Sequence, residues 1–461
     1  MGLTEFTAGR ACPTTAGSDV NERSVEREMA IMATLETPPR VVEATEQISV
    51  GISRWWRVFG GLSMNLALGT LYAWSLFVPE LGKDPEFKMY KLPAFTLTFT
   101  IAVVVFALTF VVAGRIQDKK GPFACSVLGG VLVSLGFFLS GHAHSLTGLY
   151  ICFGVIGGLG NGFGYATPIP VMAKWFPDKR GLAVGLAVGG YGAGSAIFGK
   201  LSLNYLIPAY GWRSTFEILG GIFLVMTLVG AFLLKNPPAG YKPAGWTPAP
   251  STAKAAATTY EFTPGETLRT PTFYYMWVAY ALGCSAGLMV ISQLIPFFKE
   301  SLKTTGLSPA VIASYAGTAF IVGAIGNAGG RILSGWMSDR LGRINVLRLM
   351  IGISMIAMPI LYLVGGNLGL LFTMVFVVFW CYGTQLSVNG AATADFWGTK
   401  NAGINYGMLF TAWGVAGVVG PMLGAKLRVA YSSYKAPFYA AAVLAAVALL
   451  SELLARRPKQ I

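Results

Sequence analysis

The sequence predicts an all-α integral membrane protein in which twelve transmembrane helices form two six-helix bundles. Its composition, a series of long apolar segments and an internal repeat lead to this prediction. Of the 461 residues, 54% are hydrophobic and 12% are charged, and that charged share is about half the usual value for a soluble domain. A water-soluble fold cannot bury so much apolar surface. Soluble enzymes, disordered proteins and nucleic-acid-binding proteins are therefore poor interpretations of this chain.

The apolar segments follow one another from Trp56 onward, and each is long enough for a membrane span, which takes about 20 residues. Their expected limits are 56–78, 94–116, 122–141, 146–172, 180–207, 215–235, 272–298, 309–337, 344–364, 368–392, 401–427 and 437–455. The fourth and fifth spans, and the tenth and eleventh, have short connections and are the hardest to separate. We expect an N-terminal bundle over 51–235 and a C-terminal bundle over 271–457.

Two polar regions flank these bundles. Residues 1–50 carry scattered charges and prolines with no apolar core behind a basic start, so they are predicted to be a disordered cytoplasmic tail and not a signal peptide. Residues 236–270 are rich in Pro, Ala and Thr and are predicted to be a cytoplasmic linker. An alternative start at Met29 or Met32 stays open.

The net charge of +14 predicts the orientation. Most Lys and Arg residues fall in the N-terminal region, the even-numbered loops and the C-terminus, and such regions stay on the cytoplasmic side. Both termini are therefore expected in the cytoplasm. The excess of basic residues is explained by topology and requires no nucleic-acid partner.

An eight-residue motif, G-x-x-x-D-x-x-G, occurs after the second and the eighth spans. Its two copies consist of Gly114, Asp118 and Gly121 and, 221 residues later, of Gly335, Asp339 and Gly342. Glycines allow a tight turn and close helix approach. The Asp is expected to accept hydrogen bonds from a helix N-terminus and to pair with cations such as Arg115 or Arg343. The repeat indicates a tandem duplication of a six-helix unit.

On these features residues 51–457 resemble the major facilitator superfamily. In that family the motif lies in the cytoplasmic loop between the second and third helices of each half and helps to lock the inward-closed state. The two bundles rock around a midplane site. The resemblance implies a gating role for the motif residues and Arg343. It also implies a transporter and not an enzyme, functional as a monomer in the lipid bilayer of a bacterial inner membrane.

Three further segments narrow the resemblance. Residues 174–183 (KWFPDKRGLA) are similar to a loop of the oxalate/formate antiporter family and of related monocarboxylate transporters. Residues 68–75 (LGTLYAWS) and 266–273 (ETLRTPTF) resemble the antiporter family. The resemblance implies small organic anions as substrates.

Arg331 is the most informative single residue. It lies inside the apolar run 320–337, about 12 Å along the helix from Asp339. A cation there costs on the order of 2.5–3.5 kcal/mol unless it is paired, yet no acid lies in the middle of any predicted span. The cargo is therefore the expected counter-ion, because Arg matches a carboxylate bidentately. The alternative is that Arg331 snorkels to the surface or bonds to backbone carbonyls and Asp339. By resemblance, Arg331 matches the substrate-binding arginine of the family.

Two departures from the family pattern bear on the substrate. Monocarboxylate transporters carry an Asp, implicated in proton coupling, where this chain has Asn327. The oxalate transporter carries a Lys where this chain has Trp413. One buried positive charge balances one carboxylate, which favours a monocarboxylate such as formate, lactate or pyruvate over oxalate. Oxalate/formate antiport proper stays an alternative.

Aromatic residues complete the predicted substrate site. A Tyr hydroxyl can donate to a carboxylate while its ring seals a cavity. The candidates are Tyr72, Tyr165, Tyr191 and Tyr382, with Trp413 and Asn327 beside them. Taken singly, an aromatic in a span is more often core or an interface anchor. Tyr165 and Tyr191 also match pocket positions of the family by spacing.

The mode of transport follows from the same charge. An empty site leaves Arg331 unpaired, which favours exchange, and the coupling ion or counter-substrate stays open. No metal site, cofactor or ATP-hydrolysing motif is expected, since His142 and His144 have no accompanying ligands and no P-loop is present. Two alternative functions are a transporter-like membrane sensor of a metabolite and a transporter for the efflux of organic cations. The second would require an intramembrane acid.

Overall fold

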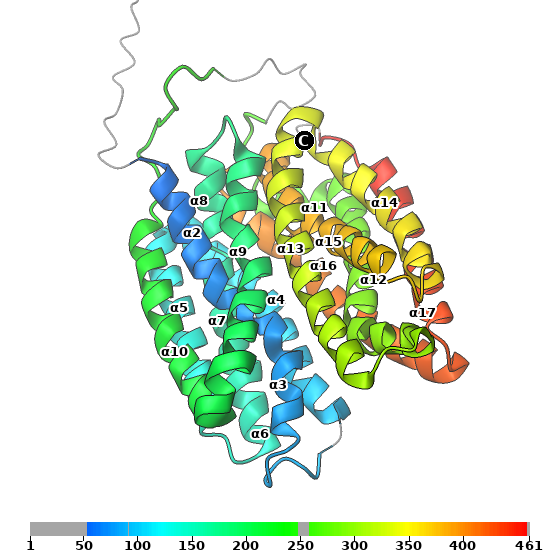
Figure 1. Cartoon of the computed structure of the whole chain (residues 1–461). Coiled ribbons are helices and arrows are strands. Elements are labelled where there is room, and N and C mark those ends of the chain that lie inside the picture. The colour runs from blue at the N-terminus through cyan, green and yellow to red at the C-terminus, as the bar shows by residue number, and fades with distance from the viewer. Residues whose placement is uncertain (1–52, 91, 248–257, 459–461) are drawn as a thin grey trace, which may run out of the picture. The chain divides into compact units, whose positions relative to one another are not determined.

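The computed structural model describes residues 53–90, 92–247 and 258–458 (Figure 1). These residues form helices and connecting segments without any strand, which confirms the all-α prediction. Up to residue 233 the helical elements are α2 (Trp55–Leu68), η1 (Gly69–Ala73), α3 (Trp74–Leu81), α4 (Leu92–Lys120), α5 (Pro122–Gly141), α6 (Leu146–Leu149), η2 (Tyr150–Ile156), α7 (Gly157–Tyr165), α8 (Pro168–Trp175), α9 (Arg180–Leu201), η3 (Ser202–Leu206) and α10 (Ile207–Leu233). From residue 264 they are α11 (Pro264–Arg269), α12 (Pro271–Ser301), η4 (Lys303–Thr305), α13 (Pro309–Leu341), α14 (Arg343–Leu363), α15 (Leu368–Trp397), α16 (Ala402–Tyr431) and α17 (Lys435–Leu454).

Eleven continuous helices in the described residues are long and apolar enough to cross a membrane. The predicted fifth and sixth spans form one of them, a helix of 54 residues, Arg180–Leu233. A straight helix of that length would measure about 81 Å, more than twice the ~30 Å hydrocarbon core of a bilayer. Gly211 interrupts it with a φ of 75°.

The chain reverses direction within this long helix. Trp175, just before α9, donates its indole N–H to the Lys235 carbonyl, just after α10, over 2.6 Å. The start of α9 and the end of α10 therefore lie at the same end of the molecule, and the helix accounts for two of the twelve predicted crossings. The pairs expected to be hardest to separate are instead cleanly divided, at 176–179 and at 398–401.

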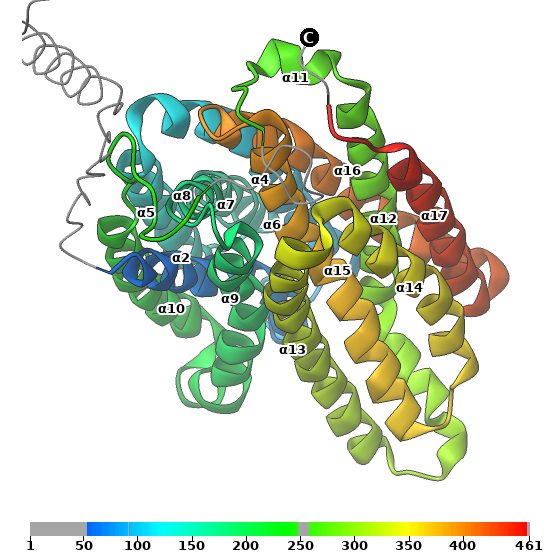
Figure 2. The ribbon, with the colours of Figure 1, turned by 90° about the horizontal axis from the view of Figure 1, so that it is seen from above.

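Helices from the two copies of the repeat pack directly against each other. α9 contacts α13, and α4 contacts α16; the first pair runs side by side in both views (Figures 1 and 2). The motif glycines make these approaches possible. A methyl group on Gly335 would overlap the Gly181 carbonyl, and one on Gly114 would overlap the Gly403 carbonyl. Only glycine permits such backbone contact.

The outside of the helical body is apolar. Leu108, Val225 and Leu450 are 63%, 64% and 63% exposed, and many other large apolar side chains share this exposure. The interior holds aromatic side chains together with Arg331, which is among the largest fully buried side chains. A surface that is apolar over its helix faces and an interior that contains a cation fit a protein surrounded by lipid.

Part of the predicted linker is ordered. Residues 258–262 lie beside the end of α15. The Thr258 amide donates to the Asp395 carbonyl, and the Phe262 amide donates to the Trp397 carbonyl. Thr263 and Glu266 form a capping box at the start of α11. Its hydrogen bonds lower the pKa of Glu266, first through the Thr263 amide. The predicted tail, residues 1–50, and linker residues 248–257 lie outside the described residues.

Candidate functional site

Arg331 lies in α13 and is 1% exposed. Its Nε donates to Asn327 Oδ1 over 2.9 Å, one helical turn earlier. Its Nη1 donates to the Tyr165 hydroxyl over 3.2 Å and to the Val188 carbonyl over 3.0 Å. The guanidinium is also 5.4 Å from the centroid of the Tyr191 ring. α13 thus presents its cation to α7 and α9, which belong to the other copy of the repeat.

No carboxylate pairs with Arg331 in the part of the chain that the structure describes, and its Nη2 donates no hydrogen bond there. Asp339, the acid considered as its partner, instead binds Arg343 over 2.7 Å. The 1% exposure contradicts the snorkelling alternative, while one backbone carbonyl does accept from the guanidinium. Hydroxyl, amide and carbonyl dipoles and a ring face therefore surround a buried cation that has no counter-ion among the residues the structure describes.

All the predicted substrate-binding residues gather around this cation. The Tyr72 and Tyr382 hydroxyls are 2.8 Å apart, and the Trp413 indole donates to Tyr382 over 2.8 Å. The Tyr191 ring lies 5.2 Å from both the Tyr72 and the Tyr165 rings. Tyr72 is partly exposed, whereas the others are buried. The cluster joins η1, α7 and α9 to α13, α15 and α16.

Sequence reasoning missed other members of the cluster. Phe106 contacts Tyr165, Phe410 and Trp413 through its ring. Tyr280 and Tyr406 lie next to Phe410, with their hydroxyls 3.3 Å apart. Both tyrosines fall inside predicted spans, so the argument that selected the other four tyrosines could have selected them too. The two phenylalanines carry no polar group that would have distinguished them from core.

Asn161 is a further missed residue. It accepts a hydrogen bond from the Tyr191 hydroxyl over 3.0 Å and is 2% exposed. It lies in α7 within a glycine-rich stretch, and such small-residue stretches commonly form packing faces between membrane helices. A polar side chain within such a face was the available indication.

The two motif aspartates make the same contacts as each other. Asp118, near the end of α4, accepts hydrogen bonds from the Gly403 and Ile404 amides over 3.0 and 2.9 Å. Asp339, near the end of α13, accepts from the Gly181 and Leu182 amides over 2.7 and 2.9 Å. Each carboxylate therefore caps the first turn of a helix from the other copy of the repeat, which is the helix N-terminus contact expected from the sequence. The end of the molecule that carries both aspartates is called the motif end below.

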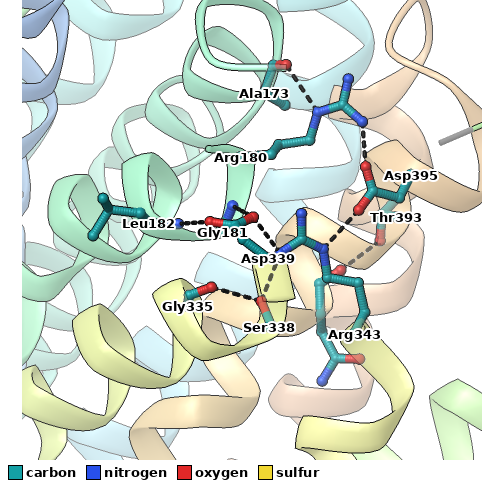
Figure 3. A network of polar contacts seen from close by, with 11 residues as sticks. Ala173, Arg180, Gly181, Leu182, Gly335, Ser338, Asp339, Arg343, Thr393 and Asp395 are labelled. Atoms are coloured by element: carbon teal, nitrogen blue, oxygen red, sulfur yellow. Dashed lines mark hydrogen bonds and ion pairs between the residues drawn. The ribbon is translucent and has the colours of Figure 1, made fainter. Parts of the chain in front are cut away.

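A network of ion pairs surrounds only one of these aspartates (Figure 3). Arg343 binds Asp339, and its Nε donates to Asp395 over 2.6 Å. Asp395 also pairs with Arg180, which begins α9. Of the two cations expected to pair with motif aspartates, Arg343 pairs with Asp339, whereas no ion pair joins Arg115 to Asp118 among the described residues. No pattern in the sequence indicates that Asp395 bridges two arginines.

The loop before α9 is held by a second pair. Arg54 binds Asp178 bidentately, over 2.6 and 2.8 Å, and lies 4.5 Å from the Phe176 ring centroid. The pKa of Arg54 is raised, first by its hydrogen bonds to Asp178. This loop thus links the start of α2 to the motif end.

Long apolar helices, a duplicated helical unit and a buried cation that pairs with no carboxylate among the described residues are features of a membrane transporter. The chain belongs to the Major Facilitator Superfamily, whose family model matches residues 58–380 and 314–460.

Relatives and solved structures agree with this assignment. The chain is 26% identical to the oxalate:formate antiporter of Oxalobacter formigenes over 81% of this chain and 85% of the antiporter. It is 29% identical to the MFS-type transporter YhjX of Escherichia coli over 79% and 86% of the two chains. It is also 29% identical to human monocarboxylate transporter 11, over 60% of this chain and 54% of that protein. In fold it is similar to the human organic anion transporter MFSD10, with a TM-score of 0.64 at 14% identity, covering 86% of this chain and 99% of MFSD10.

Proposed function

We propose that this transporter carries small carboxylate anions by alternating access and that Arg331 pairs with the carboxylate. The observation that supports this most directly is the buried guanidinium with no carboxylate partner in the described residues and an unused Nη2. A carboxylate that reaches this nitrogen gains a charge-assisted hydrogen bond and neutralises the buried charge. The site is therefore expected to bind an anion more tightly than a neutral or cationic solute.

A monocarboxylate such as formate, lactate or pyruvate is favoured over oxalate. The cluster supplies one cation, while Trp413 and the tyrosines supply neutral donors and ring faces. A dianion would leave one negative charge without a partner in a site from which water is largely excluded. Antiport of oxalate against formate is the alternative, and the similarity to the oxalate:formate antiporter supports considering it.

Exchange is the proposed mode of transport. The site without substrate holds an uncompensated charge, so crossing while empty is disfavoured and crossing with a bound anion is not. A membrane sensor built on the same body would bind anions without this turnover. Measured counterflow therefore distinguishes a transporter from a sensor.

The motif end is proposed to face the cytoplasm, with both termini on that side, in a bacterial inner membrane. On this proposal the bundles comprise 51–235 and 271–457, joined by the linker 236–270. The motif glycines, Asp118, Asp339 and Arg343 act as the gate. Hydrogen bonds donated by α16 amides to Asp118 and by α9 amides to Asp339 hold the halves together at this end, so on this proposal the conformation is closed toward the cytoplasm.

The test is anion counterflow in proteoliposomes that contain purified protein. Vesicles loaded with formate, pyruvate or oxalate are diluted into the labelled anion, and initial rates are compared. Arg331→Ala is expected to lower the rate more than about 100-fold, the loss that accompanies removal of a charged hydrogen-bonding partner worth at least 2.8 kcal/mol. Arg331→Lys keeps the charge but loses the planar fork, so it is expected to retain partial activity.

Lys200→Gln is the matched control. Lys200 also lies in a predicted span, but it is exposed and forms no ion pair within the described residues. Its removal is expected to leave exchange unchanged. Full counterflow of the best substrate in Arg331→Ala would contradict the pairing.

A further inference from the structure

A cavity of about 590 Å³ opens at the motif end, between the start of α14, the end of α15 and the end of α17. It is separate from the Arg331 cluster, with which it shares no residue. Its lining contains Arg343, Arg348, Arg456, Arg457 and a single carboxylate, Asp395. Four guanidiniums around one acid give the cavity an excess of positive charge.

The single acid does not neutralise the cavity. Asp395 is already shared between Arg343 and Arg180. Arg348 binds no carboxylate in the described part of the chain; its Nε and Nη2 donate to the carbonyls of Glu452, Leu453 and Ala455 over 3.0–3.1 Å. Those carbonyls end α17 and carry only partial negative charge. The Nη1 of Arg348 stays without a hydrogen bond to any described residue.

Arg456 and Arg457 add two further positive charges to the cavity. Both are exposed, and neither forms an ion pair among the residues that the structure describes. The backbone between them and α17 is fixed, since the Thr272 hydroxyl donates to the Arg456 carbonyl over 2.5 Å. Both arginines thus line the cavity and pair with no carboxylate among the described residues.

The lining also suits a ligand with an apolar part. Ile344, Phe396 and Leu453 line the cavity beside the arginines. Leu453 and Leu454 are 50% and 58% exposed on the outside of α17, so the cavity borders the apolar surface of the helical body. Its volume falls within the range of about 300–1,000 Å³ that holds small ligands.

We propose that this cavity binds a phosphate-bearing anion, either the headgroup of an anionic phospholipid or a free phosphate ester. Guanidinium groups can bind two phosphate oxygens at once. Arg348, Arg456 and Arg457 each have side-chain N–H groups that donate to no described residue. Arg343 lines the same cavity and holds Asp339 and Asp395. A bound phosphate therefore shares Arg343 with the ion pairs of the motif end and influences how firmly that end is closed.

The test measures binding to the full chain purified in uncharged detergent. The probes are short-chain phosphatidylglycerol, short-chain phosphatidylcholine and glycerol phosphate, titrated while ligand-bound protein is counted by native mass spectrometry. The Arg456→Gln/Arg457→Gln double variant is expected to weaken phosphatidylglycerol binding about tenfold or more, since two charge-assisted contacts are lost. Arg340→Gln, which removes an exposed arginine at the same end but outside the cavity, is the control and is expected to bind as the unmodified protein does.

The probes distinguish the two sources of phosphate. If phosphatidylglycerol binds saturably and glycerol phosphate does not bind, the ligand is a lipid headgroup. If glycerol phosphate binds as tightly as phosphatidylglycerol and displaces it, the ligand is a free phosphate ester. Equal affinity for phosphatidylcholine overturns the proposal, as does an unchanged affinity in the double variant. Neither result bears on carboxylate exchange at Arg331, so this proposal and the transport proposal fail separately.

Discussion

The two copies of the repeat build the same scaffold but distribute charge unequally. At positions 221 residues apart, the C-terminal copy has Arg331, Arg343 and Asp395 where the N-terminal copy has Phe110, Pro122 and Lys174. Both motif aspartates nevertheless cap a helix of the opposite copy with a pair of hydrogen bonds. The glycines and caps that shape the fold are thus duplicated, while the charges that we assign to substrate and gate are concentrated in one copy.

At the centre of the molecule, one hydrogen bond between neutral side chains occurs in both copies of the repeat. Tyr191 donates to Asn161 in the N-terminal copy, and Trp413 donates to Tyr382 in the C-terminal copy. These pairs occupy corresponding places, 222 and 221 residues apart. Each ties the fifth crossing of its copy to the fourth. The repeat does not extend to the rest of the cluster, since Tyr72 and Tyr165 correspond to Gln293 and Leu386, and Phe110 corresponds to Arg331.

The largest expected effect on the motif end comes from Asp395→Asn. This change leaves Arg180, which is buried, and Arg343, which is half-buried, with Asp339 as their one remaining carboxylate in the network. Breaking a buried ion pair costs about 3–5 kcal/mol, so the closed state is expected to lose about 100-fold in population relative to the open one. The measurement is alkylation of Cys284, which is fully buried near the central cluster, by an impermeant maleimide supplied from the motif end.

The background for this measurement has Ser at the other cysteines, Cys12, Cys125, Cys152 and Cys381. Lys174→Gln changes the corresponding position of the N-terminal copy and is the matched control. It is expected to leave the alkylation rate unchanged. Equal acceleration by both variants would show that the gate is symmetric, against our interpretation.

A smaller effect is expected from removing the motif aspartates one at a time. Asp118→Ala loses only a helix cap, worth about 0.5–2 kcal/mol. Asp339→Ala loses the equivalent cap and also its ion pair with Arg343. We expect Cys284 to be alkylated about tenfold faster in Asp339→Ala than in Asp118→Ala, the ratio that 1.4 kcal/mol gives. The reverse order, or identical rates, would mean that the ion pairs add nothing to the caps.

The features that sequence predicted well are those that depend on local pattern. Apolar runs predicted the spans, and Arg331 pairs with no acid among the described residues because no predicted span carries an acid in its middle. The cap by Asp339 was also predictable, because glycines and an acid at a helix end limit what that acid can reach. The break at Gly211 falls in the predicted gap between the fifth and sixth spans, residues 208–214, although helix continues on both sides of it without the expected loop.

Contacts between the two copies could not be predicted in the same way. Asp395 meets Arg180 across 215 residues of chain, and this depends on how the ends of α9 and α15 approach each other. The gathering of Phe106, Phe410 and Tyr406 around Tyr165 similarly depends on which faces of α4 and α16 turn inward. Sequence supplied the residue types for the site, and the packing of opposing glycine-bearing helices determined their partners.

The smallest predicted effect concerns substrate choice, and it sharpens the contrast between one cation and two. Trp413→Lys places a second positive charge next to Tyr382, the residue to which the Trp413 indole donates. The oxalate-to-formate ratio of exchange rates is expected to rise about fivefold, because about 1 kcal/mol of attraction for the second carboxylate survives the cost of desolvating the new cation. Trp413→Phe removes the indole donor without adding charge and is expected to leave the ratio unchanged. If oxalate is already exchanged faster than formate by the unmodified protein, the single cation does not determine selectivity, and the neutral donors around Arg331 must accommodate the second carboxylate.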